Sequence, residues 1–151
     1  MSPRDLQELQ ALIGYSFNDL EILRDALTTP AYANEHEITA DRSMNRFKTL
    51  GDAIIDVIVI QNLIDAEKST PQELTEEKIE KVRNSALPRL ADAIELREYI
   101  QWGKGQIKQE HYNSEHLASD CLESLIGAVY FDSGWEMKVT AGVYKRIEKL
   151  S

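Results

Sequence analysis

Apolar residues recur three or four positions apart along almost the whole chain, and strict two-residue alternation is not sustained in any segment. The first spacing lines up side chains on one face of an α-helix, whereas alternation lines them up on one face of a strand. Leu20, Leu23 and Leu27 form one such helical stripe, after a candidate N-cap at Asn18 or Asp19. The pattern therefore predicts an all-α fold, a compact bundle of about seven helices.

Caps and helix breakers predict where the first helices begin. We expect the first helix to open at Ser2 and Pro3, with serine as the cap and proline in the first turn. A long helix is expected from about Met44 to Ala66. Thr75 is expected to cap the next helix, because its hydroxyl can accept from the first turn and acidic residues follow it.

Proline and glycine punctuate the second half of the chain. Pro88 is expected to start a new helix rather than continue the preceding one. The polar segment 34–43 and the glycine-containing segment 102–113 are expected to be loops. Ser114 then caps a helix to about Asp132, Gly134 ends or bends it, and a final amphipathic helix reaches Leu150.

Composition limits the class of protein. The length of 151 residues suits one domain, residues 1–151, with no linker or repeat. The start of the chain lacks a signal-peptide core, and no apolar run reaches the roughly 18 residues of a membrane helix, so we expect a cytoplasmic protein with no membrane partner. The single cysteine, Cys121, agrees with a reducing compartment. The formal net charge of −9 argues against a generic nucleic-acid coat but not against an acidic nuclease site.

Acidic residues gather on two of the expected helices. Asp52 and Asp56 share a face of the long helix with Asn45 and Lys48, and Asp120 and Glu123 lie three positions apart on a later helix. Carboxylates gathered from two helices are the oxygen ligands that Mg²⁺ prefers. The alternative is a pair of solvated helix faces without function.

Two glycines stand inside the same helices. Gly51 precedes Asp52, and Gly127 lies one turn after Glu123. Glycine within a helix costs about 1 kcal/mol relative to alanine, so its presence needs a reason. We expect these glycines to let the two helices approach closely enough for their acids to share an ion. The alternative is a tolerated weak position or packing without function.

Four stretches together resemble the ribonuclease III domain family. "NRFKTLGDAIIDVIV" resembles its signature helix, and "SDCLESLIGAVYFDSG" is similar to its second acidic motif. "LIGYSFNDLEILRDALTTPAYANE" resembles the family's opening segment, and "ELTEEKIEKVRNSAL" its central segment. The resemblance extends from about Leu9 to Tyr144 in the family's order, with no double-stranded-RNA-binding domain, and so implies a stand-alone nuclease-type domain with the family's compact helical fold.

The resemblance also implies chemistry. It assigns Asp52 and Glu123 to catalysis, and Asp52, Asp120 and Glu123 to a Mg²⁺ site that Mn²⁺ could also fill. It implies a homodimer that hydrolyses double-stranded RNA, recognised by its A-form shape. Phosphate contacts are implied for Arg83, Lys104 and Lys108.

Three positions depart from the family pattern. Asn45 and Lys48 stand where the signature helix has glutamates, and Thr29 stands where a histidine is usual. Lys48 puts a positive charge beside the expected ion, unless it extends into solvent, binds a phosphate or occupies the cation site itself. Two hypotheses therefore remain open: a metal-dependent endoribonuclease with an altered site, or a catalytically impaired domain that binds RNA or acts as a dimerisation or assembly partner.

Overall fold

The computed structural model describes residues 2–66, 70–72 and 74–151. These residues form eight α-helices and four short 3-10 helices, and they contain no strand, only an isolated bridge between Thr28 and Gln101. The predicted all-α fold is confirmed. The α-helices are α1 (Leu6–Ile13), α2 (Leu20–Ala26), α3 (Pro30–Glu35), α4 (Lys48–Asp65), α5 (Glu76–Ala93), α6 (Lys104–Lys108), α7 (Glu115–Asp132) and α8 (Met137–Leu150). The 3-10 helices are η1 (Ala40–Arg42), η2 (Met44–Arg46), η3 (Leu96–Tyr99) and η4 (His111–Asn113).

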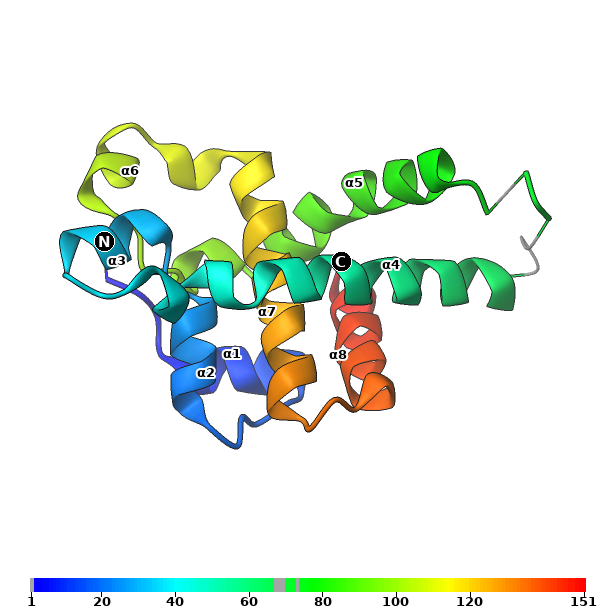
Figure 1. Cartoon of the computed structure of the whole chain (residues 1–151), viewed down its shortest axis with the longest axis horizontal. Helices are drawn as coiled ribbons and strands as arrows, with labels where there is room; N and C mark the ends of the chain where they lie inside the picture. The colour runs from blue at the N-terminus through cyan, green and yellow to red at the C-terminus, as the bar shows by residue number, and fades with distance from the viewer. Residues whose placement is uncertain (1, 67–69, 73) are drawn as a thin grey trace.

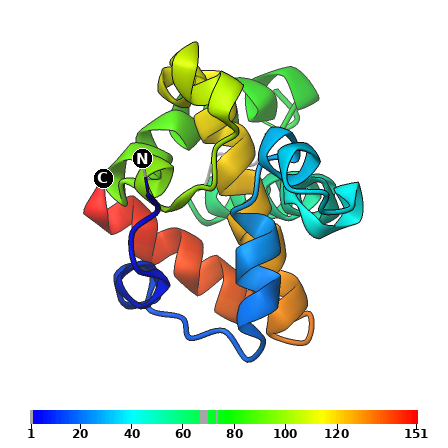
Figure 2. The ribbon, with the colours of Figure 1, turned by 90° about the vertical axis from the view of Figure 1, so that its left-hand side faces the viewer.

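Helix α7 is the centre of the fold. Helices α4, α5, α2 and α8 all pack against it. Figures 1 and 2 show α4 crossing α7, with α5 running beside α4 and with α1, α2 and α8 grouped around the other half of α7. An unbroken run of α7, residues 121–129, is buried, as expected for a helix surrounded by other helices.

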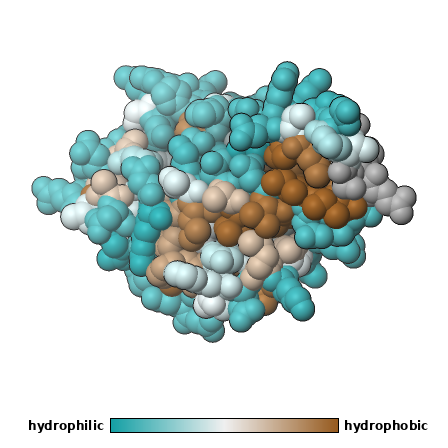
Figure 3. Space-filling view, turned by 45° about the vertical axis from the view of Figure 1, so that its right-hand side comes forward, coloured by the Kyte–Doolittle hydropathy of each residue, from teal (hydrophilic) through white to brown (hydrophobic). Residues whose placement is uncertain are grey.

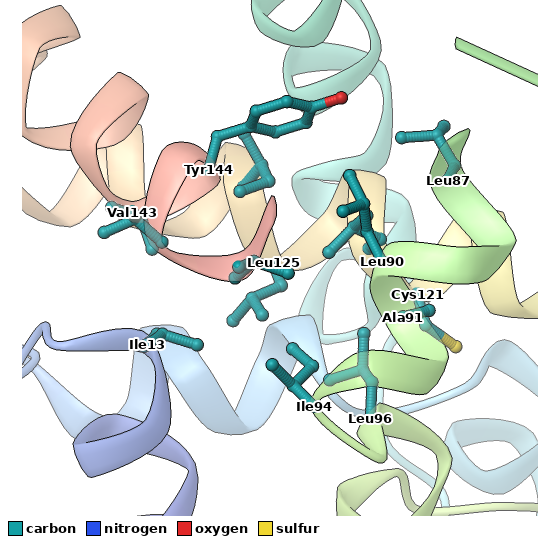
Figure 4. Close-up of a cluster of buried hydrophobic side chains, with 14 of the residues drawn as sticks. Ile13, Leu87, Leu90, Ala91, Ile94, Leu96, Cys121, Leu125, Val143 and Tyr144 are labelled. Atoms are coloured by element: carbon teal, nitrogen blue, oxygen red, sulfur yellow. The ribbon is translucent and has the colours of Figure 1, made fainter. Parts of the chain in front are cut away.

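The main hydrophobic core lies where α5, α7 and α8 meet. Figure 4 shows Leu90 of α5 and Ile94 just after it facing Leu125 of α7 and Val143 and Tyr144 of α8. All five side chains are buried. Each large apolar side chain contributes roughly 1.5–3 kcal/mol through burial, so this cluster holds the three helices together.

Helices α4 and α7 touch through their backbones. A Cβ added to Gly51 would lie 1.7 Å from the carbonyl oxygen of Glu123, and one added to Gly127 would lie 2.2 Å from the carbonyl oxygen of Phe47. Neither position has room for any side chain. The expectation that these glycines permit close approach of the two helices is confirmed.

Several helix starts and caps were predicted correctly. Asp19, Thr75 and Ser114 each accept a hydrogen bond from a first-turn backbone N–H of the helix that follows. The start of the first helix was predicted wrongly, because Asp5, rather than Ser2, caps α1 by accepting from the N–H of Gln7. The backbone N–H of Arg4, just before this cap, donates to the carbonyl of Glu98 in η3.

The predicted helix start at Pro88 and the two predicted loops are wrong. Pro88 lies inside α5 instead of starting a new helix. Its ring removes one backbone hydrogen bond, but burial of Leu87 and Leu90 holds both halves of the helix on the core. The expected loops also contain short helices, because α6 and η4 lie within 102–113 and η1 within 34–43.

Some apolar side chains remain at the surface. Figure 3 shows a band of hydrophobic residues on one face of the molecule. Val57 and Ile64 of α4 and Val139 of α8 are among the exposed large hydrophobic residues. Of the helices that the structure describes, none is both long and apolar enough to cross a bilayer.

Candidate active site

Carboxylates from α4 and α7 converge beside the glycine crossing. Asp52 directly follows Gly51, whose backbone touches that of Glu123. A single guanidinium, that of Arg83 on α5, reaches both acids: its Nη1 lies 2.6 Å from Asp52 Oδ1, and its Nη2 lies 3.4 Å from Glu123 Oε2. Three helices therefore contribute charged groups to one cluster.

Arg83 is enclosed by this cluster. Its Nε lies 3.2 Å from Asp56 Oδ1, and only 12% of its side chain is exposed. Among the residues that the structure describes, its buried Nε and Nη2 find no hydrogen-bond partner of good geometry. The guanidinium is thus held mainly by the surrounding negative charge. The RNA contact expected of Arg83 stays a prediction, because here the side chain is engaged by carboxylates.

Asp120 is paired with the lysine that departs from the family pattern. The Nζ of Lys48 lies 3.4 Å from Asp120 Oδ2, and 14% of the aspartate side chain is exposed. The exposed ring of His116 approaches the same carboxylate at 3.7 Å from its Nε2. Lys48 thus places its ammonium beside Asp120, while its side chain stays partly exposed.

Asn45 and Thr29 lie outside this arrangement. Asn45 is exposed and lies in η2. Because α4 begins only at Lys48, the helical face that Asn45 was expected to share with Asp52 does not extend to it. Thr29 caps α3 by accepting from the N–H of Tyr32, and its hydroxyl donates to the carbonyl of Gln101. Its role in the structure is local bonding.

Two acids of the cluster, Glu123 and Asp56, have raised pKa values. Burial raises the pKa of Glu123 to about 7, against the opposing effect of Arg83, and the nearby Asp52 carboxylate raises it further. Burial also raises the pKa of Asp56, again against Arg83. A carboxyl group that titrates near neutral pH is a typical feature of catalytic and ion-binding sites.

Two hollows are lined by acids of the cluster. One of about 410 Å³ is lined by polar residues of α5 and α7 that include Asn84, Ser119, Asp120 and Glu123. The other, of about 350 Å³, is lined by Asp56, Glu76, Glu80 and Arg83 with two isoleucines. Glu80, which lines both hollows, had not been singled out from the sequence, because its charge is one of many on α5.

Lys104 and Lys108 occupy a different part of the molecule. Both are exposed on α6, which packs against α3 and η4. The structure therefore does not bring them into the acidic cluster. An extended duplex could contact both regions, so their predicted RNA contacts remain predictions.

The acidic cluster fits a divalent cation in its donor type. Asp52, Asp120 and Glu123 offer the carboxylate oxygens that Mg²⁺ uses. Among the residues described, however, no group of three or more acidic, histidine or cysteine side chains is arranged ready to hold a metal ion. In the structure these acids are instead engaged by cationic side chains, Asp52 and Glu123 by Arg83 and Asp120 by Lys48.

Sequence comparison identifies the family. A family model described as ribonuclease-III-like matches residues 19–148. The chain belongs to the ribonuclease-III-like family. Ribonuclease 3 of Listeria welshimeri is 33% identical over 135 residues, and that of Glaesserella parasuis is 34% identical over 130 residues. These alignments cover 89% and 85% of this chain but 59% and 55% of the relatives. The chain thus spans somewhat more than half the length of these members of the ribonuclease-III-like family.

Solved structures of the family share the fold. Two structures of the nuclease domain of ribonuclease III from Campylobacter jejuni superpose with TM-scores of 0.77 and 0.79. Their sequence identities are 23% and 22%, over 96% and 97% of this chain and 97% and 95% of theirs. The helical bundle is therefore the ribonuclease III nuclease-domain fold.

Proposed function

We propose that residues 1–151 form a single nuclease domain that hydrolyses double-stranded RNA with Mg²⁺, for which Mn²⁺ can substitute. The observation that carries this proposal is the convergence of Asp52 and Glu123 from two helices on one cationic group. Membership of the ribonuclease-III-like family supports the reaction class.

The acids would have distinct roles. Asp52, Asp120 and Glu123 would hold the ion, which when bound supplies polarisation of the scissile phosphate and activation of water. Glu123 would be central to the chemistry. Its side chain is, like that of Asp120, largely buried. Its proton affinity lets it lose or accept a proton near neutral pH.

The proposed active form is a homodimer that contacts both strands of the RNA. One structure of the Campylobacter jejuni nuclease domain is described as having a region involved in dimer formation. Arg83, Lys104 and Lys108 are the proposed phosphate contacts. The buried, unpaired Cys121 is consistent with a cytoplasmic location, which we also propose.

A second candidate function is RNA binding or assembly without hydrolysis. The observation that favours it is the pairing of Lys48 with Asp120, where a cation would otherwise bind. The family comparison does not favour it, because the relatives are ribonucleases by name.

Cleavage of a labelled RNA duplex distinguishes the two candidates. The native chain, Glu123→Gln and Lys48→Glu are compared with Mg²⁺ and with Mn²⁺. Cutting by the native chain that is lost in Glu123→Gln supports the nuclease. Cutting only by Lys48→Glu would refute it and support the impaired domain.

A further inference from the structure

The guanidinium of Arg83 occupies the space between the acids that an ion would bridge. It contacts Asp52 and Asp56 on α4 and Glu123 on α7, at 2.6, 3.2 and 3.4 Å. A divalent ion bound between Asp52 and Glu123 would lie next to this positive charge, and the two would repel each other. The guanidinium and the ion therefore compete for the same two carboxylates.

The contacts of Arg83 are suited to exchange. Its buried Nε and Nη2 make no well-formed hydrogen bond to any residue that the structure describes. Charge–charge attraction depends less on direction than a hydrogen bond does, so it holds Nε and Nη2 without fixing one geometry. The close contact that must break is that of Nη1 with Asp52 Oδ1, at 2.6 Å.

The structure also provides a place to which the guanidinium can withdraw. The hollow of about 350 Å³ beside Arg83 is lined by Asp56, Glu76 and Glu80. Asp56 already contacts Nε on this side. A change of side-chain rotamer would exchange Asp52 and Glu123 for these acids, and the charge would remain compensated.

We propose that Arg83 is a built-in counter-ion that closes the metal site until a divalent ion displaces it toward Asp56, Glu76 and Glu80. This inference rests on the proposed function, because it takes Asp52 and Glu123 to be the ion's ligands. In the ion-free chain the arginine offsets part of the negative charge of the cluster, and in the loaded chain it moves aside. The native chain consequently binds divalent ions weakly.

Calorimetric titration with Mn²⁺ tests the proposal without RNA. Arg83→Gln should bind Mn²⁺ at least about tenfold more tightly than the native chain, because the competing charge is gone. Arg89→Gln is the matched control, since it removes the same charge from the same helix at a residue whose guanidinium bonds to Ser151. Adding Glu123→Gln to Arg83→Gln should abolish the gain.

A measurement on the native chain covers the case in which Arg83→Gln does not fold. The side-chain Nε–H signal of Arg83, assigned by its loss in Arg83→Lys, should shift on titration with Mg²⁺. An unmoved signal at saturating Mg²⁺ would overturn the proposal.

The outcomes separate this inference from the proposed function. Equal Mn²⁺ affinity of native chain and Arg83→Gln overturns the inference but leaves the nuclease intact. Tighter binding by Arg83→Gln without cleavage of RNA by any variant supports the inference and refutes the nuclease. Absence of Mn²⁺ binding by both proteins overturns both.

Discussion

The Nζ of Lys48 lies 3.4 Å from Oδ2 of Asp120, so α4 supplies a cation to an acid of α7. In the ribonuclease III family pattern that the sequence resembles, a glutamate stands at the lysine's position. The charge of the site has therefore been inverted at one point while the opposing aspartate has been kept.

Lys48→Glu should increase divalent-ion binding and reduce stability when no ion is present. The substitution replaces an attraction by a repulsion beside Asp120, and because 41% of the lysine side chain is exposed, the expected loss is only about 1 kcal/mol. Mn²⁺ titration and urea unfolding measure the two effects. Lys138→Glu, an exposed position on α8 with the same change in net charge, is the control and should leave Mn²⁺ affinity unchanged. Weaker Mn²⁺ binding by Lys48→Glu would contradict the prediction.

Gly51→Ala should destabilise the fold by about 3 kcal/mol or prevent folding. The added Cβ would lie 1.7 Å from the carbonyl oxygen of Glu123, and neither backbone can move without separating α4 from α7. Gly142→Ala is the matched control, because a Cβ at this glycine of α8 meets no atom within 4 Å. It should stabilise the chain by about 0.5–1 kcal/mol through helix propensity. Urea unfolding measures both, and equal effects of the two substitutions would disprove the explanation.

Stability without divalent ions should fall as the pH rises from about 5 to about 7. The pKa of Glu123 is about 7 in the fold, against 4.5 for an ordinary glutamate, so over this interval the folded state holds a proton that the unfolded state has lost. The contribution of Glu123 to the free energy of unfolding is fully present below its pKa in the unfolded chain. It is lost as the pH rises through its pKa in the folded chain, and we expect it to be on the order of 2 kcal/mol. Urea unfolding across this range should give a flatter profile for Glu123→Gln. An identical pH dependence in the variant would show that other groups cause it.

Lys104→Gln combined with Lys108→Gln should weaken binding to duplex RNA and reduce its salt dependence. Each lost phosphate contact lowers the slope of log affinity against log salt by about one. Fluorescence anisotropy in the Glu123→Gln background measures binding without cleavage, and Lys138→Gln serves as the control for loss of a surface charge. A slope equal to that of the unsubstituted background would exclude both lysines from the RNA path.

Local sequence signals correctly predicted several helix starts and the close contact between the two helices that carry the site. Asp19, Thr75 and Ser114 were recognisable as caps because the bonds they accept lie within three residues. Gly51 and Gly127 predicted a close helix contact because glycine is otherwise unfavourable in a helix. These features depend on the backbone within one or two turns, which the sequence pattern reports directly.

The position of Arg83 could not be predicted in the same way. It lies on a strongly charged helix where glutamates and lysines surround it, and the helical period does not say how that helix is rotated against α4 and α7. Pro88 misled for a related reason, since its cost within α5 is offset by core contacts from distant parts of the chain. Such long-range contacts determine the site chemistry but leave little local signal.

Because α4 and α7 meet backbone to backbone at Gly51 and Gly127, the crossing that carries the site does not depend on the charged side chains beside it. Substitutions such as those at Asn45 and Lys48 can accumulate without moving the helices. The fold can therefore keep its shape while the charged side chains beside the crossing change, so the helix arrangement and the charge of the site can vary independently.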